Sequence, residues 1–409
     1  MSKLTLPDAA WRDASGLKTV VAALTDSNSG PRIVGGAVRD TLLGLPVTDV
    51  DLATMLHPNA VIDRLEAGRI KAIPTGIDHG TVTAVADGKN YEITTLRRDV
   101  ATDGRRATVA FATDWKEDAA RRDFTINALY ADPATGEIFD YFGGLADLDE
   151  GNVRFIGDPN ERIAEDHLRI LRYFRFLARF GEGAVDQEAI TACAAAANSL
   201  LALSRERIAS ELLKLLALPD PRQSVSLMVR HKIFASFLPE LADDAQANLE
   251  RLLARELALA LKPSLPARLL SLLPRDADVV QNVAMRLKLS NAMRADMVGR
   301  VSGLPPVEAN IRALAYLQNI ECARDAAMLF ADDTEFLGCM SKLEGWSVPE
   351  FAIKGGDLIK RGLPAGPLVA KTLKQVEAKW IGEDFPSIDR LNPIADQAVN
   401  DALSASRKA

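Results

Sequence analysis

The stretch of sequence that decides the fold is IVGGAVRDTLLGLPVTDVDLAT, residues 33–54. Its first half runs from a short strand pattern through Gly35 and Gly36 into a helical pattern that carries Arg39. Adjacent glycines permit a tight strand-to-helix turn, and the backbone N–H groups at the start of a helix favour a bound phosphate. Arg39 lies one helical turn further on, where its guanidinium can reach the same anion. We therefore predict that Gly35, Gly36 and Arg39 hold a phosphate.

The second half of the stretch places two carboxylates close together. The alternating pattern of TDVDLAT predicts a strand in which Asp49 and Asp51 project from one face, while Val50 and Leu52 point to the core. Two carboxylates this close are costly unless a cation neutralises them. Mg²⁺ fits, because it is often held by one or two carboxylates together with substrate phosphates. A D-x-D pattern alone is also typical of solvated turn acids, but the glycine turn before it favours a metal–nucleotide site.

A third acidic residue lies on a second predicted strand, YEITTL, residues 91–96. Alternation along this strand sends Glu92 and Thr94 to one face and Tyr91 and Ile93 to the other. We therefore predict that Glu92 is the third carboxylate of the site.

The order of the predicted elements separates the chain into two kinds of structure. Short strand patterns occur up to about residue 149, in RIVGG, TDVDLAT, GTVTAVAD, KNYEITTL and GEIFDYFGG. From about residue 159 the patterns are helical, and NERIAEDHLRILRYFRFLARFG predicts one long amphipathic helix that ends at Gly181. This order predicts an α+β protein in which a small mixed sheet is followed by helices.

Composition and charge narrow the classes of protein to consider. With 409 residues, 48% of them hydrophobic and 26% charged, the chain can form more than one domain and is too apolar to be disordered. The net charge of −7 gives no support to nucleic-acid binding, although a local basic groove can occur on an acidic protein. Three widely spaced cysteines, the lack of an apolar signal region and the interrupted apolar runs lead us to expect a cytoplasmic protein without a membrane partner.

These motifs together resemble a known family. GGAVRD followed by TDVDLAT resembles the signature of the polymerase-β-like nucleotidyltransferases, and more narrowly that of the class II CCA-adding tRNA enzymes and bacterial poly(A) polymerases. The resemblance extends from about residue 30 to 380 and is strongest over residues 33–215. Five further segments carry it: RRDFTINALY (121–130), FDYFGGLADLDEG (139–151), EDHLRILRYFRF (165–176), SRERIASELLKLL (204–216) and KGGDLIKRGLPAGPLVAKTLKQVE (354–377).

The resemblance implies a division of the chain into four segments. A nucleotidyltransferase head with a small mixed β-sheet would occupy residues 1–150. An elongated, all-helical remainder would follow. It would comprise a neck with the base-selecting motif (151–215), a body (216–340) and a tRNA-contacting tail (341–409).

The chemistry of the segment EDHLR can also be interpreted without the resemblance. On a continuous helix, Asp166 and Arg169 are neighbours at positions i and i+3. A carboxylate accepts from an exocyclic amine and a guanidinium donates to a ring acceptor, so such a pair can select cytosine and adenine over guanine and uracil. Geometry alone equally allows an ordinary surface ion pair, and the resemblance favours the base-selecting role.

The resemblance assigns further nucleotide contacts to arginines and an aspartate of two motifs. Arg122 and Asp123 lie in the segment that contacts ribose and phosphate in the family, although Asp123 could also cap the following helix. Arg172 and Arg175 continue the row of Arg169 at three-residue steps. By geometry alone Arg175 could equally be a structural residue of the neck, since it lies about half a turn from Asp166.

Residues 96–120, LRRDVATDGRRATVAFATDWKEDAA, are polar and charged, a composition typical of a surface loop. The resemblance implies that they form the flexible loop with which members of the family change from C addition to A addition. Members restricted to CC addition lack this loop, so its presence argues against that restriction and leaves an A-only enzyme open.

The resemblance thus implies an enzyme that adds CCA to the 3′ end of tRNA from CTP and ATP without a template, releasing pyrophosphate. Asp49 and Asp51 would hold two Mg²⁺ ions, and Glu92 would assist the ion at the 3′-hydroxyl or act as a base. We expect the acceptor arm and 3′ end of tRNA, ATP and CTP as partners, and a monomer or weak dimer. The alternatives are an A-adding tRNA enzyme or poly(A) polymerase and, more remotely, a non-catalytic RNA-binding protein.

Overall fold

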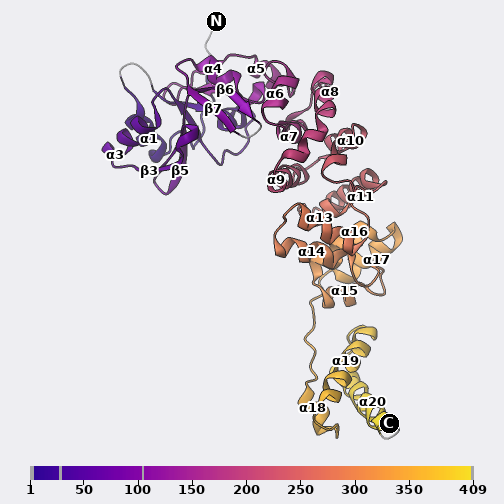
Figure 1. Ribbon diagram of the computed structural model, residues 1–409. Coiled ribbons are helices and arrows are strands. Elements are labelled where there is room, and N and C mark those ends of the chain that lie inside the picture. The colour runs from indigo at the N-terminus through magenta and orange to yellow at the C-terminus, as the bar shows by residue number, and fades with distance from the viewer. Residues whose placement is uncertain (1–3, 27–29, 104–105, 407–409) are drawn as a thin grey trace. The chain divides into compact units, whose positions relative to one another are not determined.

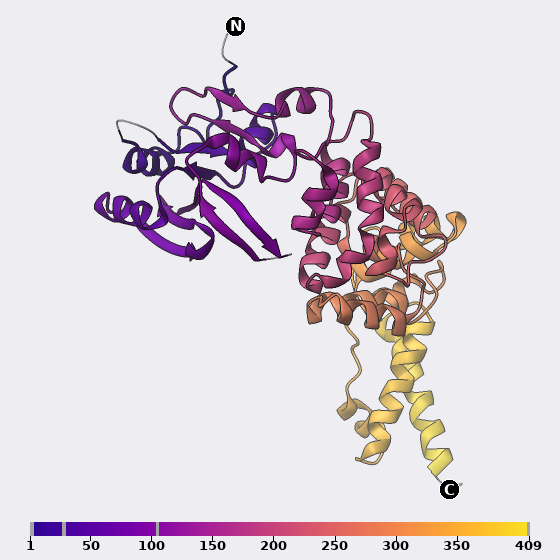
Figure 2. The ribbon, with the colours of Figure 1, turned by 45° about the horizontal axis from the view of Figure 1, so that its top comes forward.

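The computed structural model describes residues 4–26, 30–103 and 106–406 (Figure 1). The chain divides into two compact units, Met1–Pro239 and Glu240–Ala409. Among the described residues, every strand belongs to the first unit, and the second unit is helical. Figure 2 shows the strands confined to the indigo-to-purple part of the chain. The predicted α+β class is therefore confirmed, while the finer division into head, neck, body and tail stays a prediction.

A seven-stranded mixed sheet is the framework of the first unit. Its strands are β1 (Arg32–Val34), β2 (Asp51–Thr54), β3 (Lys71–Gly76), β4 (Thr81–Ala86), β5 (Lys89–Thr95), β8 (Leu129–Ala131) and β9 (Ile138–Asp140). They lie in the order β3-β4-β5-β2-β1-β8-β9, and only β2 and β5 pair in parallel. The five predicted strand segments are confirmed. Strands β3 and β8 were not predicted.

Alternation along the strands produces the core of the sheet. In β5, Tyr91 and Ile93 are buried and Glu92 is exposed, as predicted. Leu52 of β2 joins the same apolar cluster. Three helices contribute apolar residues to that cluster: α1 (Ser15–Leu24), which precedes β1, and α2 (Gly36–Leu42) and α3 (Pro58–Ala67), which follow β1 and β2.

The polar segment 96–120 contains regular structure. Strands β6 (Arg97–Asp103) and β7 (Arg106–Phe111) pair in an antiparallel hairpin, and α4 (Trp115–Ala120) follows. Asp114 caps α4, because its side chain accepts a hydrogen bond from the Lys116 N–H at 2.8 Å. Residues 104–105, within the predicted flexible loop, lie outside the described residues. The proposed use of this segment in changing between nucleotides stays a prediction.

The long helix predicted for residues 160–181 is wrong, because the chain interrupts it at Asp166. The remaining helices of the unit are α5 (Gly144–Asp149), α6 (Pro159–Glu165), α7 (Arg169–Phe180), α8 (Gln187–Ala195), α9 (Arg205–Leu216) and α10 (Arg222–Arg230). Asp166 is extended, with φ −149°, and its carboxylate accepts from the Leu168 N–H at 3.1 Å. This local bond competes with the helical pattern. The predicted stop at Gly181, directly after α7, is confirmed.

The second unit consists of helices and their connections. They are α11 (Ala245–Ala258), α12 (Leu265–Leu270), α13 (Ala277–Arg286), α14 (Asn291–Val301), α15 (Ile311–Leu317), α16 (Ile320–Phe330), α17 (Asp333–Leu343), α18 (Gly355–Lys360), α19 (Pro367–Gly382) and α20 (Ile388–Ser406). An apolar cluster around Trp380 joins the last three of these helices. Within the described ranges, no helix combines the length and the apolar character needed to cross a membrane.

Candidate active site

The three predicted carboxylates gather at the start of β2. Asp51 is the first residue of that strand and lies directly opposite Glu92 in the parallel register with β5. Asp49 precedes the strand instead of belonging to it, which corrects the prediction. The reason is that the pairing of β1 with β2 ends at Val34, which lies opposite Asp51. After Val34 the chain turns at Gly35, so the strand does not extend back to Asp49. Asp49 nevertheless lines the same cavity as Asp51.

The electrostatics of Asp51 show that these carboxylates repel one another. Burial and the neighbouring carboxylates of Glu92 and Asp49 raise the pKa of Asp51 to about 6, although Arg122 opposes the shift. A bound cation would relieve this repulsion. Among the described residues, however, no three or more His, Cys, Asp or Glu side chains are grouped to hold a metal ion by themselves. The aspartates therefore fit a hard cation that takes its other ligands from substrate phosphates and water.

The raised pKa of Asp51 predicts how the free protein responds to pH and to metal. Between pH 4 and 6 the folded state binds more protons at Asp51 than the unfolded state, so this contribution to stability falls as pH rises through that window. Because Asp51 keeps contact with water, we expect a small effect. Melting temperatures measured with and without Mg²⁺ should show more stabilisation by the ion at pH 7.5 than at pH 4.5. Equal stabilisation of wild type and Asp51→Asn at both pH values would contradict a metal site here.

A cavity of about 540 Å³ adjoins the aspartates. It is lined by the glycine turn, the segment before β2, the segment after α4, and helices α7 and α9. The lining residues are Gly35, Gly36, Arg39, Asp40, Val47, Thr48, Asp49, Asp51, Arg122, Asp123, Asn127, Arg172, Arg175, Phe176 and Lys214. All predicted site residues except Glu92, Asp166 and Arg169 are among them. The structure thus joins residues 33–54 to three motifs that lie more than seventy residues further along the chain.

The glycine turn has the conformation that its sequence predicts. Gly35 has φ 69°, a value that side chains disfavour, and a Cβ there would lie 3.4 Å from the Asn127 carbonyl oxygen. Its own N–H donates to the Leu129 carbonyl at 3.0 Å, so this group is not available to an anion. The turn therefore shapes the cavity wall, and any backbone contact to a phosphate has to come from the N–H groups that follow.

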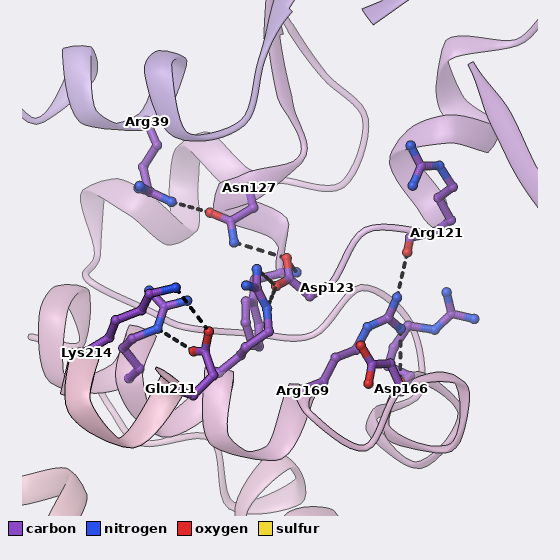
Figure 3. Close-up of polar contacts among 12 residues, drawn as sticks. Arg39, Arg121, Asp123, Asn127, Asp166, Arg169, Glu211 and Lys214 are labelled. Carbon is purple, nitrogen blue, oxygen red and sulfur yellow. Dashed lines mark hydrogen bonds and ion pairs between the residues drawn. The ribbon is translucent and has the colours of Figure 1, made fainter. Parts of the chain in front are cut away.

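A chain of hydrogen bonds crosses the cavity wall (Figure 3). Arg39 donates to the side-chain oxygen of Asn127, whose amide nitrogen donates to Asp123 at 3.0 Å. The other oxygen of Asp123 accepts from Nε of Arg172 at 2.7 Å. Asp40 also holds the Arg39 guanidinium, at 2.8 Å. Asn127 was not among the predicted site residues, although it lies in RRDFTINALY, and through Asp123 it links the two predicted arginines Arg39 and Arg172.

Asp123 is a structural partner for the groups around it. Burial raises its pKa, but the charge of Arg172 and hydrogen bonds from Asn127, Arg172 and the Phe124 N–H outweigh this effect and hold the pKa below its usual value. The predicted capping role is wrong in detail. The carboxylate accepts from the N–H of the next residue, at 2.9 Å, rather than from the following turn.

Arg122 is held by a second buried group that the sequence analysis missed. It donates to the Tyr130 hydroxyl and to Asp118, each at 3.1 Å, and Tyr130 donates to Asp118 at 2.7 Å. Burial raises the pKa of Asp118, but Arg122, Arg121 and Tyr130 outweigh it and lower the value to about 2. Asp118 is therefore an ionised carboxylate inside the protein that fixes the direction of Arg122.

The pair predicted to select the base is held by other residues. Asp166 accepts from Arg207 at 2.7 Å, while Arg169 donates to Glu165 at 2.5 Å and to the Arg121 carbonyl oxygen at 2.8 Å. Figure 3 shows Asp166 and Arg169 together on one side of the Asp123 group, with Glu211 and Lys214 on the other. The structure therefore keeps the two residues near each other, but it breaks the helix that was predicted to align them.

Helix α9 supplies three polar residues that the sequence analysis did not select. Arg207 holds Asp166, Glu211 accepts from Arg175 at 2.6 Å, and Lys214 lies 3.8 Å from Glu211. Their spacing of four and three residues places them on one helix face, and this regularity was visible in SRERIASELLKLL. Arg175 thus has a structural partner and also lines the cavity.

Family models match two parts of the chain. The poly A polymerase head domain matches residues 31–154, which include the glycine turn, the carboxylates and RRDFTINALY. A second model, a probable RNA- and SrmB-binding site of polymerase A, matches residues 184–245. The first match covers the sheet and most of the cavity, and the second covers α9.

Similar proteins extend this likeness over most of the chain. The mitochondrial CCA tRNA nucleotidyltransferase 1 of Mus musculus is 34% identical, covering 92% of this chain and 89% of that protein. The CCA-adding enzyme of Lacticaseibacillus paracasei is 35% identical, covering 90% and 93%. The structure of the Bacillus stearothermophilus CCA-adding enzyme in complex with CTP is similar, with a TM-score of 0.75, 28% identity and coverage of 95% and 98%. This chain therefore belongs to the family of CCA-adding enzymes, the CCA tRNA nucleotidyltransferases.

Proposed function

We propose that this protein adds CCA to the 3′ end of tRNA, using CTP and ATP without a nucleic-acid template and releasing pyrophosphate. The observation that carries the proposal is the cavity in which Asp49 and Asp51 adjoin four arginines held by carboxylates. The two carboxylates suit metal ions, and the fixed positive charges of the arginines suit a triphosphate. The similarity to CCA-adding enzymes over most of the chain supports the same reaction.

Enzymes of this family use divalent metal ions, and we propose Mg²⁺ as the ion here. Asp49 and Asp51 would hold it, and Glu92 would assist from β5 as a ligand or a base. The ions supply activation of the attacking 3′-hydroxyl and neutralisation of charge on the leaving pyrophosphate. The raised pKa of Asp51 supports this assignment, because burial and the neighbouring carboxylates together outweigh the opposing charge of Arg122.

The nucleotide would be held by groups that are already in position. Arg39, Arg122 and Arg172 each bond to at least one carboxylate or amide oxygen, which fixes the direction of the guanidinium. Fixed charges of this kind need little reorganisation when charge develops during the reaction. We propose that these arginines, with Gly35 and Gly36, contact the phosphates and sugar. Asp123 would position Arg172, and Arg175 would complete the wall.

Selection of the base is proposed for Asp166 and Arg169. The Asp166 carboxylate is fixed by Arg207 and the Leu168 N–H, and Arg169 is fixed by Glu165 and a main-chain carbonyl oxygen. A carboxylate that accepts beside a guanidinium that donates complements the amine and ring acceptor that cytosine and adenine share. The contacts described support the proposal because they hold both groups in defined orientations.

Replacing Asp166 by alanine should weaken the choice of nucleotide more than it slows transfer. The lost hydrogen bond to the exocyclic amine should lower the preference for CTP over UTP by about tenfold to a hundredfold. Competitive incorporation with mixed labelled nucleotides measures this ratio. Asp158→Ala, on the exposed cap of α6, serves as a control that should leave it unchanged. An unaltered CTP-to-UTP ratio in Asp166→Ala would exclude Asp166 from base selection.

The decisive experiment offers the protein three tRNA transcripts, ending before CCA, after C and after CC. Incorporation of labelled CTP into the first two transcripts and of ATP into the third is expected. Addition of ATP alone, only to the transcript ending in CC, would replace the proposal with an A-adding enzyme. ATP addition to unrelated RNA would replace it with a poly(A) polymerase. Binding of tRNA without any incorporation would favour a non-catalytic RNA-binding protein.

The proposal includes a cellular setting and partners. We propose a cytoplasmic protein that binds the acceptor arm and 3′ end of tRNA and acts as a monomer or weak dimer. Its three cysteines are buried and free, as suits a reducing compartment. Size-exclusion chromatography with light scattering measures the oligomeric state directly.

A further inference from the structure

The cations of the cavity differ in how fully the protein itself neutralises them. Arg39 pairs with Asp40 at 2.7 Å, Arg122 with Asp118 at 3.1 Å and Arg175 with Glu211 at 2.6 Å. Arg172 pairs with Asp123 at 2.7 Å through its Nε. Each arginine therefore brings a charge whose position is fixed by an internal carboxylate.

Lys214 is the exception among these cations. Its ammonium lies 3.8 Å from Glu211, beyond hydrogen-bonding distance, and Glu211 already accepts a short bond from Arg175. The Lys214 side chain is 60% exposed, whereas the arginine side chains range from 6% to 32%. An exposed lysine three residues from a glutamate on a helix gains little from such a contact. Its charge is therefore available to a ligand.

We propose that Lys214 binds a phosphate group that enters the cavity. It lines the cavity beside the Arg175–Glu211 pair, and its flexible stem gives a mobile point charge that can adapt to a phosphate whose position changes. The phosphate belongs either to the incoming nucleotide or to the backbone at the 3′ end of the RNA. The inference rests on the proposed function for the choice of these two ligands.

The residues around Lys214 argue against a purely structural role. It lies in the last turn of α9, on the same face as Arg207 and Glu211, both of which hold residues of α7 or the segment before it. Those two contacts are short and partly buried, so they suffice to fix α9 against its neighbours. Lys214 makes no comparable contact, and alanine at an exposed helical position keeps the helix intact.

The test compares Lys214→Ala and Lys214→Arg with a control lysine. Lys71→Ala is matched, because Lys71 is exposed at the start of β3 and does not line the cavity. Isothermal titration with CTP and with inorganic tripolyphosphate measures phosphate binding without RNA or turnover. Titration with a tRNA transcript ending before CCA, at several salt concentrations, measures the RNA contact. Circular dichroism verifies that each variant is folded.

Two results would support the proposal and identify the phosphate. Loss of about tenfold or more in CTP and tripolyphosphate affinity in Lys214→Ala, with retention in Lys214→Arg, assigns the nucleotide phosphate. Unchanged CTP affinity, with weaker transcript binding and a salt slope reduced by about 0.7 to 0.9, assigns an RNA phosphate. Lys71→Ala should match wild type in each case.

One result would overturn the proposal, and another would separate it from the proposed function. Equal affinities of wild type and Lys214→Ala for CTP, tripolyphosphate and the transcript would leave Lys214 without a ligand role. A wild-type protein that incorporates no nucleotide, yet binds CTP in a Lys214-dependent way, would contradict CCA addition and leave the phosphate contact in place.

Discussion

Asp51→Asn is expected to slow nucleotide incorporation by about a thousandfold or more, because loss of a metal-binding carboxylate removes several kcal/mol of charge stabilisation in the transition state. Asparagine keeps the size of the side chain and leaves the strand pairing of β2 with β1 and β5 unchanged. Single-turnover incorporation of CTP into a transcript ending before CCA measures the loss. Transcript affinity should remain close to wild type.

The same substitution separates chemistry from folding. Because burial, Glu92 and Asp49 raise the pKa of Asp51, removing its charge relieves an unfavourable interaction and should leave the free protein at least as stable as wild type at neutral pH. Asp63→Asn is a suitable control, since Asp63 is exposed on α3 outside the cavity. An Asp51→Asn protein that is folded, binds the transcript and incorporates CTP at the wild-type rate would remove Asp51 from the catalytic site.

The features that the sequence predicts well depend on short-range patterns. Alternation alone places Glu92 on the exposed face of β5, and adjacent glycines alone predict the turn at Gly35. The parallel register that puts Asp51 opposite Glu92 is a long-range pairing, but both strands were predicted and each presents its carboxylate on a definite face. The predicted cluster therefore follows from local periodicity, and the resemblance supplies its chemistry.

The features that the sequence does not predict arise where local bonds or buried partners override a pattern. The helical spacing of apolar residues over 160–181 continues on both sides of Asp166, so it does not predict a break there. The break accompanies a hydrogen bond from the Leu168 N–H to the Asp166 carboxylate. In the sequence, Asp118 is one of many charged residues in a polar segment, and nothing there predicts that it is buried. Its role depends on the fold, which places the side chains of Tyr130 and Arg122 against it. Asn127 becomes a link only when Arg39 and Asp123 meet on either side of it.

Asp118→Ala is expected to destabilise the first unit by about 3–5 kcal/mol, because removing one partner of a buried ion pair leaves the other charges uncompensated. Asp118 is 1% exposed and accepts from Arg121, Arg122, Tyr130 and the Arg97 N–H. Hydrogen exchange measured by mass spectrometry should show faster exchange in peptides of α4, β6 and β8, which carry Asp118 and its partners, with the second unit unchanged as an internal reference.

Asp114→Ala is the matched control, since it removes an aspartate from the same region that serves only as an exposed helix cap, at a cost of about 1 kcal/mol. The pH dependence distinguishes the two residues further. The pKa of Asp118 is lowered in the folded state, so its contribution is complete above the unfolded value and is lost as pH falls toward 2. Wild type should therefore lose stability between pH 4 and 2 more steeply than Asp118→Asn. If both lost stability in parallel, Asp118 would not be the ionised anchor of Arg122, and the direction of that guanidinium would have to come from Tyr130 alone.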